Sequence, residues 1–144
     1  MLQLRDVDTN NFQECVSLEV NEDQRTFVAP NMRSLAQAYV SRDAAKVFAL
    51  YDQNLMVGFA MLYVDHMEKD YELWRFMIDK RHQQKGYGRE AMAKIIDYFK
   101  SIGAKTVTLS FEPENHIAEK LYESCGFYRN GEENEGEIVM QLDL

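Results

Sequence analysis

Cysteine is scarce in this chain, which has only Cys15 and Cys125 among its 144 residues. The two lie far apart in the sequence and do not form the disulfide framework that small secreted domains need. No apolar run is long enough to span a bilayer, and the start, Met1 to Asp6, lacks the layout of a signal peptide. We therefore expect a cytoplasmic protein without a membrane partner.

Proline and glycine are also few, at two and seven residues, and they form no linker, repeat or low-complexity segment. Hydrophobic residues make up 46% of the chain and aromatic residues 12%, which excludes a disordered protein. At this length the chain can bury a substantial core. The sequence therefore predicts one domain that spans residues 1–144.

Basic residues are outnumbered, because 16 lysines and arginines stand against 24 aspartates and glutamates, for a formal net charge of −8. A protein that binds the phosphate backbone of nucleic acid needs a basic face, so we expect no nucleic-acid partner. An acidic surface instead attracts cations, amines among them. The alternative is that the surplus carboxylates only keep the protein dissolved.

Histidine is represented by His66, His82 and His116, which do not have metal-ligand spacing and are not joined by a cysteine cluster. We therefore expect no bound metal. Cys125 stands directly before a predicted helix stop at Gly126, where a small buried residue is a better interpretation than a nucleophile.

The apolar residues that are present alternate in some segments and recur at helical spacing in others. Strands are expected at residues 2–7, 47–51, 55–64, 71–78, 106–111, 127–129 and 138–142. Helices are expected from about 12 to 20, from a cap at Asn31 to about 41, from 87 to about 100, and from a cap at Asn115 to Gly126. This order describes an α/β fold, a mixed sheet with helices packed on it.

The run Gln83-Gln84-Lys85-Gly86-Tyr87-Gly88-Arg89 lies between an apolar strand and an amphipathic helix. Its two glycines allow a tight turn and a close ligand, and the amides at the start of the helix favour a phosphate. The stretch from Lys80 to Arg89 has four basic residues and no acidic one. The spacing matches neither a dinucleotide fingerprint nor a P-loop. We interpret the run as an anion site, the alternative being a tight turn without a ligand.

A second motif, Asn115-His116-Ile117-Ala118-Glu119-Lys120-Leu121-Tyr122-Glu123-Ser124-Cys125-Gly126-Phe127, follows the next predicted strand. Together the two runs resemble the GCN5-related N-acetyltransferase superfamily, in which Gln/Arg-x-x-Gly-x-Gly/Ala binds the pyrophosphate of acetyl-CoA. Its second signature is Asn-x-x-Ala-x-x-Leu-Tyr-x-x-x-Gly-Phe. The resemblance is strong from Leu73 to Phe127. It implies a mixed, mostly antiparallel sheet of six to seven strands, about four flanking helices, and acetyl transfer from acetyl-CoA to an amine.

The resemblance also implies roles for single positions. Met77 and Ile78 end the strand at which the family splays its sheet and holds the acetyl-pantetheine arm through backbone groups. The pyrophosphate would be bound through the amides and charges of Gln83, Gln84, Lys85, Gly86, Gly88 and Arg89. Gln84 replaces the glycine often found there, but its amide can still donate. Asn115 would contact the pantetheine arm, and Tyr122 would protonate the departing CoA thiolate.

A proton acceptor is also needed, because the amine must lose a proton to attack the thioester. Glu72 is our candidate, since strand alternation places it on the same side as Trp74, Phe76 and Ile78. The carboxylate position common in the family falls at Trp74 instead, so Glu72 does not follow from the resemblance. The alternative is an exposed glutamate at a strand edge.

Carboxylates are expected around the acceptor, where the first helical region and the loop before the motif strand flank the cleft of the family fold. We predict substrate-binding roles for Glu22, Asp65 and Glu68. The segment from Asn21 to Asn31 is similar to one in bacterial diamine or spermine/spermidine acetyltransferases, which indicates a polyamine acceptor. Alternatives are a protein or aminoglycoside amine, or an acyl-CoA-binding sensor without catalysis. The family analogy also makes a homodimer an expectation.

Overall fold

Seven strands form one open sheet in the computed structural model, which describes all residues from Met1 to Leu144. The strands are β1 (Leu2–Arg5), β2 (Ala45–Asp52), β3 (Leu55–Asp65), β4 (Asp70–Ile78), β5 (Thr106–Phe111), β6 (Tyr128–Asn134) and β7 (Glu137–Asp143). Their order is β1-β2-β3-β4-β5-β7-β6, and every neighbouring pair is antiparallel except β4 and β5. The expected α/β fold with a mostly antiparallel sheet is confirmed.

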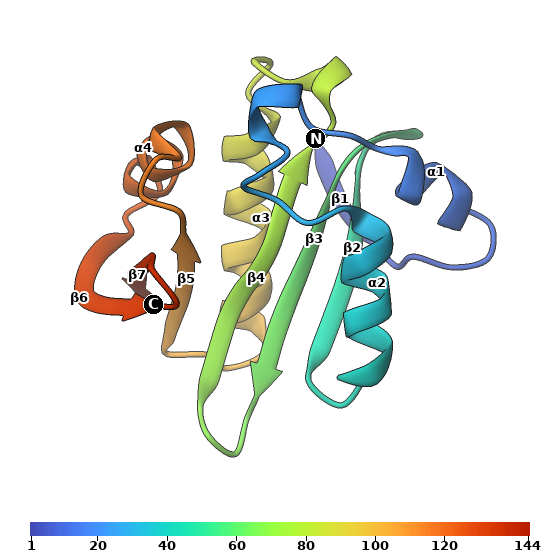
Figure 1. The fold of residues 1–144 in the computed structure, drawn as a ribbon. Coiled ribbons are helices and arrows are strands. Elements are labelled where there is room, and N and C mark those ends of the chain that lie inside the picture. The colour runs from blue at the N-terminus through green and yellow to red at the C-terminus, as the bar shows by residue number, and fades with distance from the viewer.

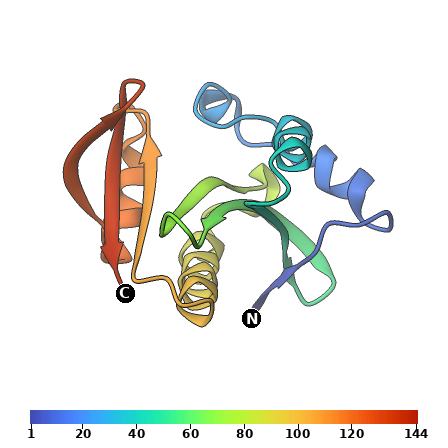
Figure 2. The same cartoon turned by 90° about the horizontal axis from the view of Figure 1, so that it is seen from below.

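Helices cover both faces of this sheet (Figure 2). They are α1 (Phe12–Ser17), α2 (Asn31–Val40), α3 (Tyr87–Ser101) and α4 (His116–Ser124), with 3-10 turns η1 (Glu22–Gln24) and η2 (Lys80–His82). One apolar cluster joins α3 and α4 to the sheet, and a second, smaller one joins α1 and α2 to the opposite face. No helix is long and apolar enough to cross a membrane.

The sheet separates between β4 and β5, which run parallel but share a single registered pair, Glu72 with Thr108. Beyond that pair the two strands diverge toward the end of β4 (Figure 1). From Leu73 onward, β4 pairs with β3 alone, so the backbone groups on its other edge are free of a sheet ladder. The fold therefore opens a slot in the middle of its own sheet.

A β-bulge at Trp74 changes which side chains of β4 share a face. In the β3–β4 ladder Met61 pairs with Arg75 and Leu62 with Leu73, so Trp74 is an extra residue. Leu73 before the bulge, and Phe76 and Ile78 after it, pack with the cluster of α3, whereas Trp74 and Met77 pack with that of α1 and α2. The expectation that Glu72 shares a face with Phe76 and Ile78 is therefore wrong, because alternation was counted through the bulge.

Two helix boundaries also differ from the expectation. Helix α1 ends at Ser17 rather than near residue 20, because the backbone is extended at Leu18. The amide of Glu19 then donates a hydrogen bond to the carboxylate of Asp79, directly after β4. Helix α2 begins at Asn31 itself, after Pro30. The Asn31 side chain is buried and donates to the Cys15 carbonyl, so it ties α2 to α1 instead of capping its own helix.

Candidate active site

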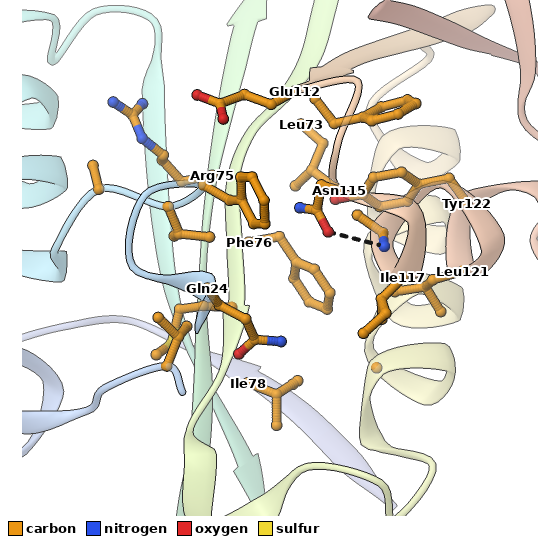
Figure 3. A pocket seen from close by; sticks show the side chains of 18 of the residues that line it. Gln24, Leu73, Arg75, Phe76, Ile78, Glu112, Asn115, Ile117, Leu121 and Tyr122 are labelled. Atoms are coloured by element: carbon orange, nitrogen blue, oxygen red, sulfur yellow. Dashed lines mark hydrogen bonds between the residues drawn. The ribbon is translucent and has the colours of Figure 1, made fainter. Parts of the chain in front are cut away.

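A cleft of about 970 Å³ occupies the slot between β4 and β5 (Figure 3). Its walls come from both faces of the sheet. Gly88, Asn115 and Leu121 line it from the side of α3 and α4. Val28, before α2, and Arg33, in the first turn of α2, line it from the other side. Two ligands can therefore approach the separated strands from opposite faces and meet between them.

The loop before α3 presents backbone amides at one end of this cleft. Gln84 and Gly86 have left-handed conformations with φ of 61° and 85°, and the first amides of α3 follow at once. Successive amides in this arrangement form a concave site for an anion, and the helix dipole adds to it. The left-handed φ at Gln84 also explains why a glycine suits that position. The loop therefore fits a pyrophosphate group.

Most of the loop residues predicted to bind the pyrophosphate line the cleft, namely Gln83, Gln84, Gly86, Gly88 and Arg89. Lys85 is exposed and is not part of the lining. The Gln83 side chain donates to the Ile78 carbonyl and the Gln24 side chain, both at 2.9 Å, and accepts from Asn21. Its role within the chain is to hold the loop against β4 and η1.

Asp79 is a part of this loop that sequence reasoning missed. The residue is only 1% exposed, and its carboxylate accepts hydrogen bonds from the backbone of Glu19 and from the backbone and Nε of Arg81. Burial opposes its ionisation, but the hydrogen bonds and charge of Arg81 outweigh this and lower the pKa of Asp79. The feature of the sequence that could have indicated this residue is its position directly after an apolar strand.

The middle of the cleft suits the acetyl-pantetheine arm. Met77 and Ile78 line it, and the free edge of β4 offers backbone donors and acceptors there. Asn115 uses its side-chain oxygen to accept from the Ala118 amide at 3.3 Å, capping α4 as predicted (Figure 3). Its side-chain nitrogen remains a donor toward the cleft.

Tyr122 reaches the same cleft from α4, with its hydroxyl end toward β4 (Figure 3). The side chain packs between Phe111 and Phe127, and only 9% of the residue is exposed. Burial, with a smaller effect of Cys125, raises the pKa of Tyr122 well above its usual value. The phenol therefore keeps its proton at physiological pH, as a general acid requires.

Glu72 lies on β4 at the point where the sheet separates, and it lines the cleft. Burial and the neighbouring Asp70 carboxyl raise the pKa of Glu72 to about 7. A carboxylate with a pKa near the working pH can take a proton from an ammonium group and release it again. Glu72 alternates with Tyr71 and Leu73, which pack with the cluster of α3, so Glu72 lies on the face of α1 and α2 instead.

The carboxylates predicted to bind substrate lie elsewhere: Glu22, Asp65 and Glu68 are not part of the cleft lining. Asp65 ends β3 and Glu68 lies in the turn that follows, at the far end of β4 from the anion loop. The carboxylates that line the cleft besides Glu72 are Glu112, Glu135 and Glu137. Residues 135 and 137 fall between the strands expected at 127–129 and 138–142, and only the pairing of β7 with β5 brings them to the cleft.

The sheet is split, with an anion-binding loop at one end of the cleft and a protonated tyrosine at the other. This arrangement is typical of an acyltransferase whose acyl donor is a phosphate-bearing carrier. The model of the acetyltransferase (GNAT) family matches residues 9–127, and the chain belongs to that family. The predicted acetyl-CoA-dependent N-acetyltransferase is thereby confirmed, with acetyl-CoA as the donor.

Similar proteins include the spermine/spermidine N(1)-acetyltransferase of Bacillus subtilis (strain 168), which is 30% identical over 151 residues, with 99% of each chain covered. The crystal structure of spermidine N-acetyltransferase from Vibrio cholerae with CoA and spermine gives a TM-score of 0.79 at 22% identity, covering 99% of this chain and 95% of that one. A dodecameric structure of spermidine N-acetyltransferase from Vibrio cholerae gives 0.74 at 22% identity, covering 99% and 93%. At these identities the structural likeness shows the fold alone.

Proposed function

We propose that residues 1–144 form one domain that transfers the acetyl group of acetyl-CoA to a primary amine of a polyamine such as spermidine or spermine. The observation that carries the proposal is the cleft between β4 and β5, which is lined from both faces of the sheet. Donor and acceptor can then meet directly in a ternary complex. The choice of a polyamine is supported by the name of the Bacillus subtilis relative.

Two side chains move the protons in this scheme. Glu72 accepts the proton of the ammonium group, directly or through a water molecule, so that the nitrogen can attack the thioester carbonyl carbon. As the nitrogen–carbon bond forms and the carbon–sulfur bond breaks, Tyr122 donates its proton to the sulfur. Their environments suit these opposite tasks, because burial near Asp70 raises the pKa of Glu72 to about 7 and burial keeps Tyr122 protonated.

Assembly and location belong to the same proposal. We expect a homodimer or a larger assembly of identical chains, supported by the dodecameric relative from Vibrio cholerae. We expect the enzyme to act in the cytoplasm, where the donor acetyl-CoA is available. The acceptor is a small-molecule amine.

The test is a panel of amines with detection of the CoA thiol, comparing spermidine and spermine with lysine peptides and aminoglycosides. We expect turnover with the polyamines, and in Tyr122→Phe a loss of roughly 100-fold in kcat with nearly unchanged acetyl-CoA affinity, because only the acid is removed. Turnover restricted to peptides or aminoglycosides would contradict the polyamine assignment. Acetyl-CoA binding without thiol release from any amine would identify a sensor instead.

A further inference from the structure

The wall of the cleft next to α2 carries two guanidinium groups. Arg75 and Arg33 both line the cleft, and the Arg75 side chain extends from β4 toward α2 (Figure 3). It is half-buried, and its Nη2 donates to the Gln37 Oε1 of α2 at 2.9 Å. The guanidinium also lies 5.6 Å from the centre of the Trp74 ring. These contacts hold Arg75 in place without neutralising it.

Neither arginine has a carboxylate partner. The six ion pairs of the chain involve neither Arg33 nor Arg75, although acidic residues outnumber basic ones. Burial and the positive charge of Arg33 lower the pKa of Arg75, and Glu137 opposes this only in part. Keeping the half-buried Arg75 charged beside another positive charge is costly, and an anionic ligand group would offset that cost.

The opposite wall carries negative charge. Glu137, on β7, accepts from the Ser110 hydroxyl at 2.7 Å, and Glu112 and Glu135 lie on the same side of the cleft. The acceptor end thus has both cations and Glu72 on the β4–α2 wall, and carboxylates alone on the β5–β7 wall. A polyamine is attracted by the carboxylates of the cleft but repelled by the two arginines. An amine that also bears a carboxylate can be attracted by both.

We propose that the acceptor end also takes amines that carry a carboxylate, with Arg33 and Arg75 binding that carboxylate as the amine faces Glu72. This adds a second acceptor class and rests on the acetyl transfer proposed above. The planar guanidinium of Arg75 can donate two parallel hydrogen bonds to a carboxylate, which gives direction as well as attraction. Acetylation proceeds at the amine of such a compound, and its carboxylate is unchanged.

Matched acceptors isolate the carboxylate, because lysine differs from cadaverine, and ornithine from putrescine, only by that group. The readout is the ratio of kcat/KM for lysine to that for cadaverine. We expect this ratio to fall about 10-fold or more in Arg75→Gln, the size expected for a charge-assisted hydrogen bond, and by a smaller factor in Arg33→Gln. Arg33 is exposed and forms none of the ion pairs, so its variant tests the idea even where Arg75→Gln folds poorly. Arg42→Gln, at an exposed arginine outside the cleft, should leave the ratio unchanged.

A binding measurement separates this inference from the proposed function. Trp74 is the single tryptophan and lies beside Arg75, so its fluorescence should report lysine binding in the presence of CoA. A lysine-dependent change that is at least 10-fold weaker for cadaverine, and weakened in both arginine variants, supports the carboxylate site even if no amine is acetylated. The inference is overturned if spermidine is acetylated while lysine neither binds nor reacts. It is equally overturned if the two arginine variants leave the lysine-to-cadaverine ratio as it is in the wild type.

Discussion

Glu72 shows how burial can prepare a single residue for catalysis. An ordinary glutamate has a pKa near 4.3 and is a weak base at neutral pH. Burial at the point where β4 and β5 separate, next to Asp70, raises the pKa of Glu72 to about 7. Because the pKa of Glu72 is higher in the folded chain than in the unfolded chain, ionisation of Glu72 lowers the free energy of unfolding. Stability from this group is present at low pH and is lost as the pH rises toward 7.

The substitution Glu72→Gln should therefore change both activity and stability. We expect kcat/KM to fall roughly 100-fold, with loss of the limb that rises with pH through about 7 in the wild type. We also expect the decrease in Tm between pH 5 and pH 8 to become smaller, since the glutamine does not ionise. Both are measured by initial rates and thermal unfolding over that pH range.

Asp70→Asn is the matched control for this prediction. It keeps Glu72 but removes the neighbouring charge that helps to raise the pKa, so the rising limb should move to lower pH without disappearing. An unchanged limb in Glu72→Gln would show that another group accepts the proton.

At the scale of single elements, the end of β4 and the loop after it are held by contacts from distant parts of the chain. Gly58 on β3 is paired with Ile78, and a Cβ at that position would lie 2.4 Å from the Met77 carbonyl oxygen. Only glycine allows the two strands to approach this closely. At the start of α3, the Tyr87 hydroxyl donates to Asp52 at 2.6 Å, and the Leu2 amide donates to Glu90 at 2.6 Å. The anion loop thus lies between two anchored elements.

Asp79→Asn tests the buried carboxylate that organises this loop. We expect a loss of about 1–3 kcal/mol in the free energy of unfolding at pH 7, because Arg81 loses its charged acceptor, together with weaker acetyl-CoA binding. The folded pKa of Asp79 is lowered, so its contribution is present above an unfolded pKa of about 3.9 and is lost as the pH falls below it.

Urea unfolding at pH 7 and pH 3, with calorimetric titration of acetyl-CoA, measures these effects. The difference in stability between the two proteins should be smaller at the lower pH. Asp97→Asn, at an exposed aspartate on α3, should behave as the wild type throughout. A difference between wild type and Asp79→Asn that is as large at pH 3 as at pH 7 would contradict the role of the charge.

At the scale of the whole molecule, the sheet consists of two parts, β1–β4 and β5–β7, joined by one ladder pair and by the shared core of α3 and α4. A donor bound between the parts would contact the free edges of both β4 and β5. Saturation at about 100 times Kd would add about 2.7 kcal/mol and raise Tm by about 5–10 °C. Hydrogen exchange should slow at residues 73–78.

Adenosine 3′,5′-bisphosphate is the control ligand, because it lacks the pantetheine arm. It should give a smaller Tm shift and leave exchange at residues 73–78 unchanged. Equal protection by both ligands would argue that the arm does not run along β4.

Local patterns predicted much of the fold and the part of the site that is contiguous in sequence. Alternating apolar residues marked β3, β4 and β5, helical spacing marked α3, and the cap at Asn115 marked the start of α4. The misplaced face of Glu72 has a specific cause. A bulge needs a partner strand for its definition, and alternation along one strand cannot detect it.

The sequence by itself determined the order of elements, the amide-rich turn before α3 and the position of Tyr122 on α4, because these depend on neighbours a few residues apart. Only the tertiary structure decided which charges line the cleft. Glu22, Asp65 and Glu68 lie outside the lining, whereas Glu112, Glu135, Glu137, Arg33 and Arg75 belong to it alongside the predicted Glu72 and Arg89. The physical reason is that strand pairing and the separation of β4 from β5 bring together residues far apart in the chain, and burial in that cleft then raises the pKa of Glu72 and lowers that of Arg75.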